Sequence, residues 1–306
     1  MSVGLARSLF KAVDDEALDT VMDLSKVPDV PQIPLERYEP PRGRPANLDS
    51  ILIPENAARL EETAKRGEEM GGREWYNLEP LRMAFLEEMG PSGDDSFRRY
   101  VDYVAATSPR STVAGNIRRA SHFYNLDKNG QPVGGLTNAD MPKGYGHIAH
   151  TTHDHKLREI EENGGLLPIK GPKVSSFAEN LKGNQTPMTI DTHNFSAVRN
   201  DPKNKKSPTN TQYKYLEEYQ AEIADKLGMT PAQFQASVWM AGDTGVADAR
   251  PFMAVFDDVL SNTAERDGKS RSEALRDFIN GKAPLYGIAG LMAGAQLADP
   301  ESNEEI

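Results

Sequence analysis

Apolar side chains recur every three to four residues along most of the chain from about residue 55 onward. In 94–106, for example, Phe97, Tyr100, Val101 and Val104 fall on one side of a helix. No stretch shows convincing strand alternation, and no internal repeat is present, so we expect an all-α fold. The same spacing predicts helices over 5–25, 73–89, 94–106, 112–124, 150–162, 172–183, 192–200, 212–227, 248–264, 270–280 and 284–296.

Local signals set several helix boundaries. A helix is expected to end before Pro109, because a residue that precedes proline avoids the helical region. Asn163-Gly164-Gly165 predicts a left-handed carboxyl cap, and Pro172 fits the first position of the next helix, which Gly183 closes. Thr230, Pro231 and Gln233 predict a helix that starts with a capping box.

The amino-terminal segment has a different composition. Seven prolines lie between residues 28 and 54 and exclude a continuous helix there. We expect an extended proline-rich arm that wraps its own domain or contacts a protein partner. The expected organisation is an amino-terminal helix and arm over 1–54, a helical domain over 55–296 and an acidic tail over 297–306.

Composition narrows the function classes. The 306 residues carry a formal net charge of −11 and contain no cysteine. Disulfides, thiol nucleophiles, thiolate zinc sites and iron–sulfur clusters are thereby excluded. No run approaches the roughly 20 apolar residues that span a bilayer, and no secretion signal is evident, so we expect a cytoplasmic protein without a membrane partner. Residues 165–215 nevertheless carry eight basic and three acidic side chains, which predicts one basic face on an acidic body.

The segment 167–193 combines groups that suit chemistry on a phosphate-bearing ligand. A tight turn leads into helix 172–183, whose amino-terminal N–H groups favour an anion, and Lys173 lies in its first turn. Asp191 follows at the start of the next helix, where it also fits a simple capping role. Lys173 equally fits an exposed surface lysine.

These residues resemble the active-site stretch of the helix-hairpin-helix DNA glycosylases, the endonuclease III-like superfamily. Leu167, Pro168, Gly171 and Lys173 match its hairpin pattern, Ile190, Asp191, Thr192 and His193 match its second motif, and 18 positions separate Lys173 from Asp191. The resemblance implies a DNA base-processing enzyme of the glycosylase and abasic-site lyase type that needs no cofactor. Asp191 would be the catalytic carboxylate and Lys173 the Schiff-base nucleophile. A phage-type relative would act in the host cytoplasm.

The residue types suit that reaction. Cleavage of a glycosidic bond develops positive charge on the sugar, which a fixed carboxylate stabilises. The target base must first leave the stack. Tyr145, flanked by glycines, is expected to be exposed and to stack on that base, whereas Trp75, Tyr76, Phe177 and Trp239 are expected mainly in the core. The remaining expected DNA-contacting residues are Pro168, Lys170, Gly171, Lys182, His193, Lys203, Lys205 and Lys206.

The histidines are weak candidates for metal ligands. Four of the six, His147, His150, His153 and His155, lie close together, but their spacing does not place them on one helical face. We therefore expect no metal site, with these four as the only candidates. Gln233 and Gln235 are interpreted as capping and surface residues.

Three other functions fit the same residues. A phage enzyme of this fold that hypermodifies thymine would keep the flipped base and the carboxylate but leave the glycosidic bond intact. A DNA-binding or virion-associated module that lost the chemistry is favoured by Ile169 and Ser196, which replace a glycine and an arginine of the family pattern. A plain interaction protein would use the proline-rich arm.

Overall fold

The computed structural model describes residues 45–145, 148, 150–167, 171–201, 203, 206–242 and 249–286, and within these ranges the chain contains helices and no strand. The all-α expectation is therefore confirmed for the described part of the chain. Short helical turns are η2 (Ala46–Leu48), η3 (Gly72–Glu74), η4 (Gly90–Ser92) and the π-helical η5 (His150–Asp154). The α-helices are α3 (Pro54–Glu69), α4 (Glu79–Met89), α5 (Gly93–Thr107), α6 (Val113–Lys128), α7 (His155–Glu162), α8 (Pro172–Leu181), α9 (Thr192–Arg199), α10 (Asn210–Lys226), α11 (Pro231–Ala241), α12 (Phe252–Asp267) and α13 (Arg271–Ile279).

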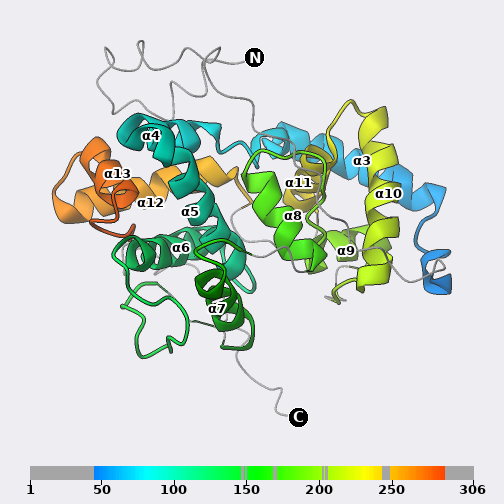
Figure 1. The fold of residues 1–306 in the computed structure, drawn as a ribbon. Coiled ribbons are helices and arrows are strands. Elements are labelled where there is room, and N and C mark those ends of the chain that lie inside the picture. The colour runs from blue at the N-terminus through cyan, green and yellow to red at the C-terminus, as the bar shows by residue number, and fades with distance from the viewer. Residues whose placement is uncertain are drawn as a thin grey trace.

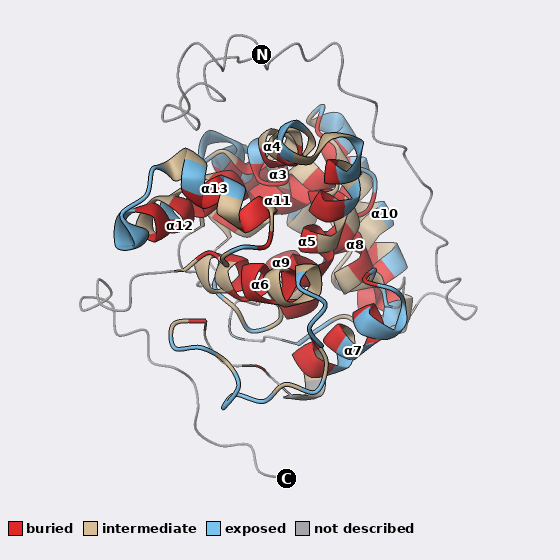
Figure 2. Cartoon of the chain, turned by 60° about the vertical axis from the view of Figure 1, so that its left-hand side comes forward, coloured by how far each residue is buried: buried red, intermediate tan, exposed pale blue. Residues whose placement is uncertain are grey.

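The helices form two groups that lie side by side (Figure 1). Helices α4, α5, α6, α12 and α13 surround a large hydrophobic cluster that includes Phe85, Tyr100 and Phe278. Helices α3, α9 and α10 surround a small cluster that includes Leu60 and Phe195. Buried residues concentrate where the helices face one another (Figure 2). Helix α8 packs on α5 and contributes Leu181 to the large cluster, so it lies at the boundary between the groups.

Helix α11 joins the two clusters. Ala232 and Ala236 belong to the large cluster, whereas Phe234 and Val238 belong to the small one. A helix that is apolar on all sides is expected to be buried on all sides. Its contact with α3 is close, because Gly67 lies directly against the backbone of Ser237.

We expect Gly67→Ala to destabilise the protein by about 2 to 3 kcal/mol. The added methyl group would overlap the carbonyl of Ser237 and force α3 and α11 apart, which outweighs the better helix propensity of alanine. Urea unfolding measures the change, and Arg66→Ala, at the exposed neighbouring position of α3, is the control. Equal stability of the two variants would contradict the close contact.

Several expected boundaries are confirmed and others are corrected, among them the helix expected over 248–264, which is α12 over Phe252–Asp267. The capping box of Thr230 and Gln233 is present, α5 ends at Thr107, and Gly164 and Gly183 adopt positive φ angles. The expected helix 73–89 is instead interrupted, because Pro80, in the first turn of α4, lacks an N–H and would clash with a preceding helical turn. Helix α6 continues four residues beyond its expected end to Lys128, since Leu126 packs against the large cluster.

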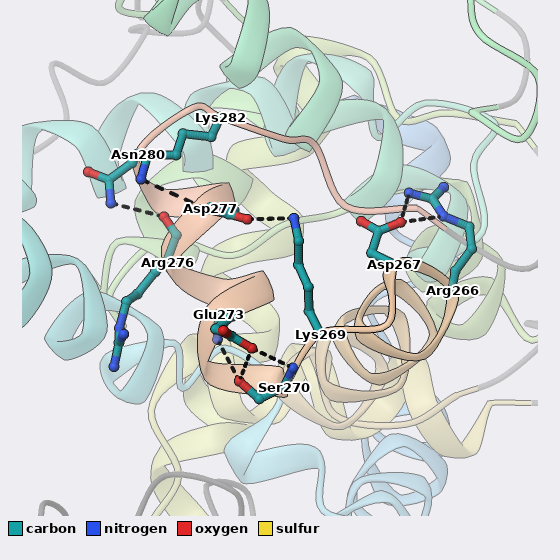
Figure 3. Close-up of polar contacts among 9 residues, drawn as sticks. All are labelled: Arg266, Asp267, Lys269, Ser270, Glu273, Arg276, Asp277, Asn280 and Lys282. Carbon is teal, nitrogen blue, oxygen red and sulfur yellow. Dashed lines mark hydrogen bonds and ion pairs between the residues drawn. The ribbon is translucent and has the colours of Figure 1, made fainter.

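The connection between α12 and α13 is fixed by polar contacts (Figure 3). Ser270 and Glu273 form a capping box at the start of α13. Lys269 Nζ lies 2.7 Å from Asp277 Oδ2, so the connection is tied to the body of α13. These contacts explain the helix start, and we assign them a structural role.

Some expectations lie outside the described residues. These are the helix over 5–25, the arm as far as residue 44, the tail over 297–306 and nearly all of the helix over 284–296, of which only 284–286 are described and are not helical. The end of the arm packs on the domain, because Leu48 is fully buried. Among the described residues, no helix has both the length and the apolar character needed to cross a membrane.

Candidate functional site

Lys173 lies at the exposed start of α8. The helix begins at Pro172, directly after Gly171, which has a φ of 80° and is exposed. A positive φ is accessible to glycine without strain, so this residue lets the chain turn sharply into the helix. Lys173 is half-buried in the first turn, where the backbone N–H groups have no preceding turn to donate into.

Asp191 is held at the start of α9. Its Oδ1 accepts a hydrogen bond from the Asn194 backbone N–H at 2.8 Å, which makes it the N-cap of that helix. The residues before it, Met188 and Ile190, are buried in the small cluster and fix the approach of the chain. Asp191 itself is half-buried, and its other carboxylate oxygen has no hydrogen-bond partner among the described residues. The carboxylate is therefore both fixed and available.

A buried tyrosine connects α8 with the segment that carries Asp191. The Tyr213 hydroxyl accepts a hydrogen bond from the Ile190 N–H at 2.8 Å and donates one to the Met188 carbonyl at 2.6 Å. Ser176, which lies one turn after Lys173 on the same side of α8, is near enough to lower the pKa of Tyr213 slightly. Burial raises the pKa of Tyr213 well above its usual value, so the phenol stays neutral and keeps this link intact.

A second buried tyrosine lies near the Asp191 carboxylate. Tyr76 donates a hydrogen bond to Gln235 Oε1 at 2.7 Å. Burial raises the pKa of Tyr76, and the negative charge of Asp191 raises it further. The ring of Tyr76 lies 6.2 Å from that of Phe177, which follows Ser176 on α8. Tyr76 thus links α8 with α11, whereas Tyr213 holds the segment before Asp191.

Aromatic rings form the base of this region. Trp75 packs against Phe177 and Trp239, with ring centroids 6.0 and 5.4 Å apart. Trp75, Tyr76 and Phe177 are buried as expected, and Trp239 is half-buried. These rings link η3, α8 and α11 beneath the segment that carries Asp191.

Lys182 was expected to contact DNA, but it is instead the largely buried counter-ion of Asp102. Its Nζ lies 2.6 Å from Asp102 Oδ1, with the side chains 13% and 1% exposed. Burial raises the pKa of Asp102, and Lys182 opposes that shift. Asp102 Oδ2 also accepts the Leu167 N–H at 3.2 Å. The pair therefore ties α8 and the loop before it to α5, and Lys182 adds no charge to an exposed basic face.

The expectation that Tyr145 is exposed is wrong. Its side chain is 1% exposed, with ring centroids 5.0 Å from His122 and 5.1 Å from Tyr286. The flanking glycines indicated an exposed loop, but the Tyr145 ring packs between α6 and the segment after α13. Tyr145 is therefore not available to stack on a base in this structure.

The described histidines hold structural positions. His153 is buried, and its Nε2 donates to the Pro109 carbonyl at 2.7 Å. His155 is exposed, and its Nδ1 lies 3.8 Å from Glu159 Oε1. Among the described residues, no group of three or more His, Asp or Glu side chains could hold a metal ion. His147 and the side chain of His150 lie outside the described residues.

The other expected DNA-contacting residues fall into two sets. Lys203 and Lys206 are exposed in the loop before α10, and His193 is half-buried in the first turn of α9. Pro168, Lys170 and Lys205, like Ile169, lie outside the described residues. The exposed lysines sit on the loop that follows α9, the helix capped by Asp191.

Sequence reasoning missed two polar residues of this region. Gln235 was expected at the surface but is 2% exposed, because it accepts the Tyr76 hydroxyl. Tyr213 received no role, although it holds the backbone on both sides of Thr189. For Gln235 a signal was available: it is a polar residue among apolar ones in α11, and buried amides require partners.

Comparison with known protein families identifies the family of this chain. A family model described as "Family of unknown function (DUF7178)" matches residues 51–246. That range contains Lys173, Asp191 and both tyrosines. Neither the curated proteins nor the solved structures contain a significant match to this chain.

Proposed function

The chain belongs to DUF7178, a family of unknown function, so its activity must be inferred from its own residues, and we propose that it processes a base in DNA by glycosylase and abasic-site lyase chemistry. Asp191 is the carboxylate and Lys173 the amine. One observation carries the proposal: the Asp191 carboxylate is held as the N-cap of α9 with one oxygen that has no hydrogen-bond partner among the described residues, and Lys173 lies in the exposed first turn of α8. Both proposed reactive groups thus lie at helix starts.

In the proposed reaction Asp191 and Lys173 have separate roles. With the target nucleotide out of the stack, Asp191 stabilises the positive charge that develops on the sugar. The Lys173 amine loses a proton and forms a bond to C1′ as the C1′–N bond to the base breaks, and the base leaves with the electron pair and takes up a proton. Ring opening gives a Schiff base at C1′. Hydrolysis of the Schiff base then frees Lys173 and leaves an abasic sugar. Alternatively, loss of a C2′ proton expels the 3′ phosphate and cleaves the strand.

Other features support a nucleic-acid substrate. Lys173 lies at the start of α8 and the exposed Lys203 and Lys206 lie in the loop after α9, although the protein as a whole is acidic. The free N–H groups at the start of α8 suit a phosphate. Phosphate contacts of this kind predict binding that weakens as salt increases.

Borohydride trapping tests the proposal. Incubation of the protein with a duplex that contains an abasic site, followed by borohydride, is expected to give a covalent protein–DNA complex. Lys173→Ala is expected to lose that complex completely, because borohydride can only reduce a Schiff base that has formed. Lys214→Ala, at an exposed lysine of α10, is the matched control and should trap like the wild type.

Two results would overturn the lyase assignment. One is a wild-type protein that gives no adduct while it binds the duplex in a salt-dependent way, which would indicate a binding module. The other is equal trapping by Lys173→Ala and the wild type, which would place the reactive amine elsewhere.

A further inference from the structure

The turn between α5 and α6 gathers positive charge that no carboxylate balances. Arg110 is exposed in this turn, and Arg119 of α6 is only 6% exposed. Neither forms an ion pair with an acidic residue in the described part of the chain. A buried arginine without a counter-ion is costly, since buried charges are normally paired.

Arg119 points toward the start of its own helix. Its Nη1 donates to the Thr107 carbonyl at 3.1 Å and to Ser111 Oγ at 2.5 Å, so the guanidinium lies against the turn. Its Nε is buried and has no partner. Burial lowers the pKa of Arg119 to about 10, and the charge of Arg118 adds to that shift, with no carboxylate opposing it. The side chain is still charged at neutral pH; because its Nη1 is used by Thr107 and Ser111 and its Nε is enclosed, it contributes charge to the turn and no direct hydrogen bond.

The helix ends do not neutralise this charge. The carboxyl end of α5 and the amino end of α6 meet at the turn, and their partial charges are opposite and of similar size. His153, which donates to the Pro109 carbonyl, adds none: burial lowers its pKa to about 4, helped by the charges of Arg119 and Arg110, so it is neutral at pH 7. Two arginine charges therefore remain.

The same turn offers unused backbone donors. The Thr112 side chain accepts the Gly115 N–H, and its carbonyl accepts the Asn116 N–H. Val113 and Ala114, the first two residues of α6, have no preceding helical turn to donate into. Backbone N–H groups at a helix start, together with arginine, form the usual recognition pattern for a phosphate group.

We propose that the α5–α6 turn is a binding site for a phosphate group. Val113 and Ala114 supply backbone donors, Arg110 supplies an exposed charge, and Arg119 supplies a buried charge beneath the turn. The site does not include Lys173 or Asp191, so it stands independently of the base-processing proposal. Its phosphate belongs either to nucleic acid or to a small phosphorylated molecule.

Thermal unfolding in inorganic phosphate, against chloride at equal ionic strength, tests the site. Saturating phosphate is expected to raise the wild-type Tm by about 2 °C or more. Arg110→Asn removes the charge and tolerates the left-handed backbone there, where φ is 55°. Val113→Pro removes one N–H at a helix position that accepts proline, after a residue that is already extended. Both variants are expected to lose most of the shift.

Matched variants separate this site from others. Asn210→Pro makes the same change at the first residue of α10 and should keep the shift. Arg119→Met should lose it. If that variant does not fold, the two turn variants decide the test. An absent wild-type shift, or one that survives in both turn variants, would overturn the proposal.

Duplex DNA binding then identifies the source of the phosphate. If the site takes a DNA phosphate, the two turn variants should weaken binding about tenfold and reduce the slope of log affinity against log salt by about one. If they lose the Tm shift but bind DNA like the wild type, the ligand is a small phosphorylated molecule.

Discussion

Asp191→Asn will reduce base release by at least about 10²–10³-fold while leaving the fold intact. Asparagine caps a helix about as well as aspartate, so the hydrogen bond from the Asn194 N–H is kept. The negative charge that would stabilise the sugar cation is lost, and removal of one such stabilising group has an effect of about this size. Single-turnover assays on a duplex with a modified or damaged base measure the change.

Two variants separate chemistry from capping. Asp191→Ala removes both roles and should lose activity together with about 1 kcal/mol of stability. Thr209→Ala removes the equivalent cap of α10 and should lose similar stability with activity unchanged. Near-wild-type base release by Asp191→Asn would show that Asp191 acts only as a helix cap.

Lys182→Met will lower the free energy of unfolding by about 3 to 5 kcal/mol. The substitution leaves the Asp102 carboxylate, which is 1% exposed, without its counter-ion at 2.6 Å. The double variant Asp102→Asn, Lys182→Met removes both charges and keeps an acceptor for the Leu167 N–H, so it should recover most of the loss. Urea unfolding of the two single variants and the double variant gives the coupling energy.

The pH dependence of that variant follows from the same burial. Burial raises the pKa of Asp102, and Lys182 opposes this, so its removal raises the pKa further. In the unfolded chain the Asp102 carboxyl group loses its proton near pH 4, whereas in the folded chain it does so only at higher pH. The folded state therefore becomes less stable as pH rises between these two pKa values. Lys182→Met should therefore regain stability between pH 7 and 5, and the double variant should not. A pH-independent loss would contradict a buried carboxylate.

Local sequence rules predicted most of the secondary structure. Capping residues and glycines act through their own backbone neighbourhood, which is why Thr230, Gly164 and Asp191 were placed correctly. The break before α4 was missed because the apolar spacing runs through it, although Pro80 was visible. Periodicity alone cannot show whether one helix or two carry the same pattern.

The environment of the site could not be derived in the same way. Lys182 and Asp102 are 80 positions apart, and nothing in a run of basic residues shows that one of them turns inward. Tyr145 lies among glycines and proline, but the partner that buries it, Tyr286, comes from the far end of the domain. Such pairings depend on the tertiary arrangement, whereas the positions of Lys173 and Asp191 at helix starts follow from local sequence.

Mass spectrometry of the borohydride-trapped wild-type complex tests the central claim most directly. After digestion of protein and DNA, the reduced sugar adduct should lie on Lys173, in the peptide that begins α8. An adduct on Lys203, Lys206 or another exposed lysine would show that the amine of Lys173 is not the reacting group.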